Sequence, residues 1–113
     1  MTDTFKPPPF GIELARDGAT ATVAILGELD ISTTPELTEA LRSLEPGYDT
    51  LVVDLSRCTF FASSGISILL EKSHRAKEED FELVVIKAPA EVQRMFDLAG
   101  LDDKLTFAEQ PPA

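Results

Sequence analysis

The chain has 113 residues, of which 43% are hydrophobic, and its formal net charge is −10 at pH 7. This length fits a single domain whose core needs no metal ion or disulfide. The acidic excess argues against sequence-independent nucleic-acid binding, which depends on Lys and Arg, and against docking on an anionic membrane. The chain has one cysteine, Cys58, and no apolar run of membrane-spanning length, so we expect a cytoplasmic protein.

Both ends of the chain are predicted to lie outside the folded domain. Residues 1–9 are polar and end in three prolines, which predicts a flexible N-terminal tail. We expect a single domain over residues 10–108 and a short C-terminal tail over residues 109–113.

The domain is predicted to open with two strands and a helix. Apolar residues alternate along residues 10–15 and again along 21–26, which is the period of a β-strand. Asp17-Gly18 between them is typical of a hairpin turn, so the pair is antiparallel. Thr33 then suits a helix cap, and Glu36 stands at the spacing of a capping box. The apolar face of this helix is predicted to be Leu37, Ala40, Leu41 and Leu44.

The second half of the chain alternates strands with helices. Apolar runs predict buried strands over residues 51–55 and 81–86, and a short last strand over 105–107. Helices are predicted to begin near Ser63 and at Pro89. The order β-β-α-β-α-β-α-β therefore predicts a mostly parallel sheet with right-handed crossovers and the hairpin at one side.

Helical spacing also predicts which face of each later helix is buried. On the helix that begins near Ser63, Lys72 is expected among the outward-facing charges. On the helix that begins at Pro89, Gly100 is expected to form the C-terminal cap. The predicted inner faces are Ile66, Leu69, Leu70, Ser73 and Lys77 for the first, and Val92, Met95, Phe96 and Ala99 for the second.

Two hydroxyls, Ser63 and Ser64, stand where a strand gives way to a helix, an edge at which α/β sheets often build sites. Catalysis by Ser63 would need a nearby base, and the only histidine is His74. Eleven residues of helix separate the two, or about 16 Å at the helical rise. A nucleophile elbow needs a glycine where Phe61 stands, so an enzyme is disfavoured.

A modified hydroxyl is the functional alternative to a simple helix cap at this position. A phosphate there would meet free backbone N–H groups and the positive end of the helix dipole. It would also add a charge of about −2 to an acidic surface. A partner that fits the bare hydroxyl would be repelled, which predicts a binding switch that requires no refolding.

Four short motifs, in order, resemble the STAS domain family and, more narrowly, the bacterial anti-sigma factor antagonists. They are Gly27-Glu28-Leu29-Asp30, Val53-Asp54-Leu55-Ser56, Ser63-Ser64-Gly65 and Met95-Phe96-Asp97-Leu98-Ala99-Gly100-Leu101. The resemblance covers nearly the whole chain, from Phe10 to Phe107. It implies an α/β fold of STAS type, with a mixed, mostly parallel sheet of four to five strands, an N-terminal antiparallel hairpin and three to four helices.

The resemblance also implies a regulatory cycle. The unphosphorylated domain binds an anti-sigma factor, which is a serine protein kinase, and so frees a sigma factor. Phosphorylation of Ser63 releases the domain, and a serine phosphatase restores it. No cofactor, nucleic acid or membrane is implied, and the domain is expected to be a monomer or weak dimer. The residues implied at the partner-binding surface are Asp30, Ser32, Thr33, Ser64, Gly65 and Ile66.

Ala62 departs from the family pattern, in which an Asp usually precedes the target serine. The absence of this Asp either removes a residue that positions the loop or lowers the charge cost of a phosphate on Ser63. For Asp30, a place on the partner surface and a turn or cap role are both open. Two other functional classes remain: a STAS subunit of a transporter or lipid-trafficking assembly, and a serine hydrolase, which the distance to His74 disfavours.

Overall fold

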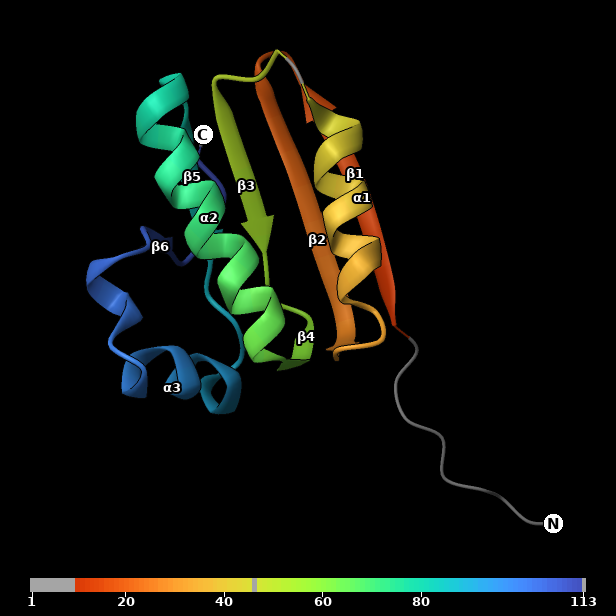
Figure 1. Cartoon of the computed structure of the whole chain (residues 1–113), viewed down its shortest axis with the longest axis vertical. Helices are drawn as coiled ribbons and strands as arrows, with labels where there is room; N and C mark the ends of the chain where they lie inside the picture. Colours follow the sequence, from red (N-terminus) through yellow and green to blue (C-terminus); the bar gives the residue numbers. More distant parts are fainter. Residues whose placement is uncertain (1–9, 46, 113) are drawn as a thin grey trace, which may run out of the picture.

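The computed structural model describes residues 10–45 and 47–112, so the predicted tail of residues 1–9 lies outside the described residues. Within these ranges six strands form one mixed sheet accompanied by three α-helices (Figure 1). The elements are β1 (Gly11–Asp17), β2 (Thr20–Leu29), α1 (Thr34–Leu44), β3 (Thr50–Asp54), β4 (Cys58–Phe61), α2 (Ser63–Glu79), β5 (Glu82–Ile86), α3 (Ala90–Leu98), the 3-10 helix η1 (Leu101–Asp103) and β6 (Phe107–Ala108).

The sheet has the strand order β1-β2-β3-β5-β6, and the short β4 pairs with β2 off this path. Only β1 and β2 pair in antiparallel fashion among the described strands; the other pairs are parallel. Gly18 turns the hairpin with a φ of 60°, a conformation that glycine adopts without strain. The predicted fold class, a mostly parallel sheet with an N-terminal antiparallel hairpin, is confirmed.

The main core lies between the sheet and the two longer helices. Figure 1 shows α1 and α2 side by side across one face of the sheet. The strands direct alternate residues toward this face, and the residues between them, Val52, Val84 and Ile86, form a second buried cluster, which explains the nearly continuous apolar runs at residues 51–55 and 81–86. At one end of the core the Phe96 ring lies 5.6 Å from both the Phe61 and Phe107 rings, between centroids, and so joins α3 to β4 and β6.

The strand β4 was not predicted from the sequence, and β2 runs three residues beyond its predicted end at Leu26. The two differences have one cause, because the added end of β2 pairs with β4. Glu28 lies opposite Phe60 and Leu29 lies opposite Phe61. A four-residue strand becomes regular only through such tertiary pairing.

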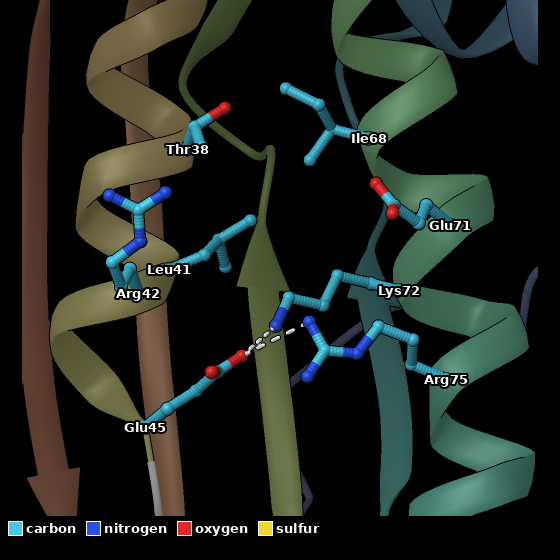
Figure 2. Close-up of a pocket in the computed structure, with 8 residues that line it drawn as sticks. All are labelled: Thr38, Leu41, Arg42, Glu45, Ile68, Glu71, Lys72 and Arg75. Atoms are coloured by element: carbon cyan, nitrogen blue, oxygen red, sulfur yellow. Dashed lines mark hydrogen bonds and ion pairs between the residues drawn. The ribbon is translucent and has the colours of Figure 1, made fainter.

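The predicted inner face of α2 was partly wrong. Lys77 is exposed, whereas Lys72 is buried with only 9% of its side chain exposed. Lys72 donates a hydrogen bond to Glu45 at the end of α1, and Arg75 Nη1 lies 3.7 Å from the same carboxylate oxygen (Figure 2). The Lys72 hydrogen bond, reinforced by both cations, holds the pKa of Glu45 below its ordinary value. The buried charge is therefore paired, as burial of a lysine requires.

The predicted inner face of α3 also needs correction. Met95 and Ala99 are exposed, and Gln93 takes an inner place beside Val92 and Phe96. A glutamine is tolerated there because its Oε1 accepts a hydrogen bond from the Ala88 amide at 3.1 Å. The expected glycine cap is confirmed, since Gly100 follows α3 with a φ of 74°.

Candidate functional site

The start of α2 is held against the end of β2. Ser63 is the first helical residue, and Ala62 before it has the extended conformation of a cap residue, with φ −70° and ψ 159°. The Ala62 amide donates to the Leu29 carbonyl at 2.9 Å, so the entry to the helix is anchored on the sheet. The Ala62 carbonyl accepts hydrogen bonds from the amides of Gly65 and Ile66.

The two serines have different surroundings. Ser63 is exposed, whereas Ser64 is half-buried, with its Oγ 2.7 Å from Thr34 Oγ1. Thr34 Oγ1 donates to the Asp30 carbonyl at 2.8 Å, and a hydroxyl has one proton to give. Ser64 must therefore donate to Thr34, which commits its proton within the molecule. Ser63 is the hydroxyl presented to another molecule.

Asp30 shapes the loop between β2 and α1. One carboxylate oxygen, Oδ1, accepts hydrogen bonds from the amides of Ser32 and Thr33 at 3.0 Å and from their hydroxyls at 2.7 and 3.1 Å. The Ser32 hydroxyl contributes most to the lowered pKa of Asp30, followed by the Thr33 amide. This geometry is that of an Asx turn, so the turn role of Asp30 is present whether or not a partner also touches it.

The predicted capping box at α1 is wrong, because Thr33 makes no side-chain cap hydrogen bond to the helix. Its hydroxyl instead accepts from the Asp30 amide at 2.9 Å. The hydrogen bond between Thr34 and Ser64 places this loop beside the start of α2. Sequence reasoning had not singled out Thr34.

Gly65 is buried, and a glycine stands there because the surrounding side chains leave no room for a Cβ, not because a partner contacts it. A Cβ built at Gly65 would lie 2.6 Å from Leu29 Cδ2 and 2.8 Å from Phe61 Cζ. Ile66 beside it is half-buried and packs against the core. Of the residues implied at the partner surface, Ser32 is the exposed one, while Asp30, Thr33 and Ser64 are partly covered.

An exposed isoleucine in the loop was missed. Ile31 leaves 80% of its surface in solvent, and Phe60 on β4 leaves 40%. The sequence signal was an isolated apolar residue between Asp30 and Ser32. In addition, no Lys or Arg occurs between residues 17 and 41 or between 58 and 71, and Arg57, just before β4, is paired with Glu13.

The N-terminal end of α2 should gain stability when Ala62 is replaced by Asp. Ala62 has cap conformation but no acceptor, and α2 has no side-chain cap. An Asp there accepts a hydrogen bond from an amide of the first turn, which adds about 0.5–2 kcal/mol to the free energy of unfolding. Urea denaturation measures the change. Ala62→Asn supplies the same acceptor without charge, and a failure of both variants to gain stability would contradict the cap geometry.

A separate groove of about 220 Å³ lies between α1 and α2, further along α2 from Ser63 (Figure 2). Its lining residues are Thr38, Leu41, Arg42, Glu45, Ile68, Glu71, Lys72 and Arg75. Four of the five charged side chains in its lining are paired: Glu45 with Lys72 and Arg75, and Arg42 with Glu39. The pairs of Glu45 with Lys72 and Arg75 join the end of α1 to α2, so a structural role accounts for the groove.

Three other features would bear on function in the described part of the chain: a membrane-spanning helix, a metal site and a catalytic base for Ser63. No helix there is long and apolar enough to cross a membrane. No three His, Cys, Asp or Glu side chains there gather as metal ligands. His74 lies in α2 with Ser63, as predicted, and its Nε2 is 3.5 Å from Glu78 Oε2 on the exposed side. Cys58 is buried, which raises the pKa of its thiol.

Known proteins resemble the chain over most of its length. The anti-sigma-B factor antagonist of Staphylococcus aureus is 29% identical over 88 residues, which are 77% of this chain and 82% of that protein. The crystal structure of an anti-sigma factor antagonist from Mycobacterium paratuberculosis is 25% identical, with a TM-score of 0.72, covering 90% of this chain and 87% of that one. Unphosphorylated SpoIIAA, 18% identical, has the same fold, with a TM-score of 0.72 over 90% of each chain.

The family match covers the whole folded region that positions Ser63. A family model described as "Mlab, STAS domain" matches residues 12–107, from β1 to the start of β6. The chain belongs to the STAS domain family.

Proposed function

We propose that this STAS domain is an anti-sigma factor antagonist whose binding is switched by phosphorylation of Ser63. The observation that carries the proposal is the difference between the two serines at the start of α2. Ser63 is exposed at the first helical residue, whereas the Ser64 proton is committed to Thr34. The names of the relatives, anti-sigma-B factor antagonist among them, supply the kind of partner.

In the proposed cycle the bare domain binds an anti-sigma factor and so releases a sigma factor for transcription. The anti-sigma factor is also the serine kinase that phosphorylates Ser63, and a serine phosphatase reverses the modification. The domain itself performs no chemistry in this cycle and acts in the cytoplasm. A base for Ser63 is not provided by His74, which lies three turns further along the same helix.

The test is incubation with ATP and an anti-sigma kinase encoded in the same genome, followed by intact-mass measurement. We expect one phosphate on the wild-type chain and none on Ser63→Ala. Ser67→Ala is the matched control, because Ser67 is an exposed serine one turn further along α2 and should leave the phosphate in place. Absence of phosphate with every such kinase, or a phosphate that persists in Ser63→Ala, would reject the proposed switch.

A further inference from the structure

A chain of hydroxyl hydrogen bonds ties the loop between β2 and α1 to the start of α2. Ser64 donates to Thr34, and Thr34 donates to the Asp30 carbonyl. Thr34 is the first residue of α1 and Ser64 the second of α2, so the bond joins the first turns of two helices 30 residues apart in sequence. The position of the loop relative to Ser63 therefore depends on two side-chain hydroxyls.

This loop presents an apolar side chain from a well-held backbone. Ile31 is 80% exposed, although the residues on both sides of it are hydrogen-bonded. The Asp30 carboxylate accepts from Ser32 and Thr33, and the Asp30 carbonyl accepts from the amides of Thr33 and Thr34. The exposure of Ile31 is thus a feature of an ordered turn. A β-branched side chain on an ordered turn loses little conformational freedom when a partner covers it.

The surroundings of Ile31 indicate what kind of surface would cover it. Phe60 is 40% exposed on β4, which pairs with the end of β2 from which the loop departs. Figure 1 shows the loop, β4 and the start of α2 at the same end of the molecule. Glu28 and Glu36 are exposed on either side of the loop, and Arg57, whose carbonyl accepts from Gly27 on β2, is paired with Glu13. A matching surface has an apolar pocket with basic residues at its rim.

We propose that Ile31 is an apolar anchor that enters a pocket with a basic rim on the protein partner, and that the Ser64–Thr34 hydrogen bond sets its position. This inference rests on the proposed function, because the partner is the anti-sigma factor. The inference assigns a separate role to each residue of the site. Ser63 carries the modification, Ile31 supplies the contact, and Thr34 and Ser64 are positioning residues that need not touch the partner.

The anchor is tested by calorimetric titration of the anti-sigma kinase encoded in the same genome. Ile31→Ala should weaken binding about tenfold or more, as truncation of a central anchor does. Leu14→Ala is the control, because Leu14 is 46% exposed on β1, away from this end, and its truncation should leave affinity unchanged. If the wild-type protein binds and Ile31→Ala binds with the same affinity, the proposed anchor role of Ile31 is overturned and the proposed function is not. Absence of wild-type binding would overturn the proposed function with it.

The positioning role has its own readout without any partner. Ser64→Ala and Thr34→Val should speed amide hydrogen exchange at residues 32–34 by about two- to tenfold, the effect of losing one hydrogen bond. Thr34→Ser keeps the hydroxyl and should restore wild-type exchange, and Ser67→Ala should not change it. Unchanged exchange in the first two variants would overturn the positioning role.

A double-mutant cycle separates positioning from general damage to the fold. Ser64→Ala should lower affinity in the wild-type background but add little in the Ile31→Ala background, because its effect passes through Ile31. Additive losses would show that Ser64 acts independently of the anchor and would overturn the link between them.

Discussion

Phosphorylation of Ser63 is expected to weaken binding to the anti-sigma kinase by on the order of 100-fold, or about 2.7 kcal/mol. A kinase that transfers phosphate to Ser63 must hold its nucleotide phosphates in line with the serine oxygen. After transfer, a group of charge about −2 faces the phosphates of the remaining ADP. Two unit charges 4 Å apart at a protein surface repel by about 4 kcal/mol, which is enough for the loss.

The measurement is titration of the kinase with phosphorylated and unphosphorylated protein, in the presence and in the absence of ADP. Repulsion by the nucleotide predicts a larger loss with ADP than without it. Equal losses would contradict the charge explanation and leave the size of the phosphate as the cause. Ser67→Glu, which places a charge one turn further along α2, should change affinity much less.

Replacement of Gly65 by alanine is expected to lower the free energy of unfolding by about 1–3 kcal/mol, the usual cost of overpacking a core. In an open helix the same change would stabilise by roughly 0.5–1 kcal/mol, so the sign of the effect reports the clash. The new Cβ would lie 2.6 Å from Leu29 Cδ2 and 2.8 Å from Phe61 Cζ, at the junction of α2 with β2 and β4. Neither side chain can move easily, because both are buried.

Urea denaturation of Gly65→Ala beside Gly11→Ala tests this explanation. Gly11 has open space around a built Cβ and no positive φ, so its replacement should be close to neutral. A stabilised Gly65→Ala would show that the contact with Leu29 and Phe61 relaxes without cost. A destabilised variant that still accepts phosphate on Ser63 would separate the packing role of Gly65 from the switch.

Local patterns in the sequence were enough to predict the order of the main elements. Alternation predicted β1 and β2, and helical spacing with a Pro or Gly at the ends predicted α1 and α3. These signals work because backbone preferences and burial periodicity act over a few neighbouring residues. The start of α2 at Ser63 was predicted for the same reason. The position of His74 on the same helix, too far along to act as a base for Ser63, was predicted as well.

Contacts between distant segments decided what the patterns left open. The pairing of β4 with β2 lengthened β2 and made β4 a regular strand. The ion pair with the Glu45 carboxylate allows the charged Lys72 side chain to be buried. Both depend on residues far away in the chain, which no local period encodes.

The sequence by itself determined that two hydroxyls and a glycine stand at the start of a helix in an acidic STAS-like domain. Only the tertiary structure distinguished their roles, because each role depends on a neighbour from another element. Thr34 of α1 accepts the hydrogen bond of the Ser64 hydroxyl, Leu29 and Phe61 leave Gly65 no room for a side chain, and Ser63 remains exposed.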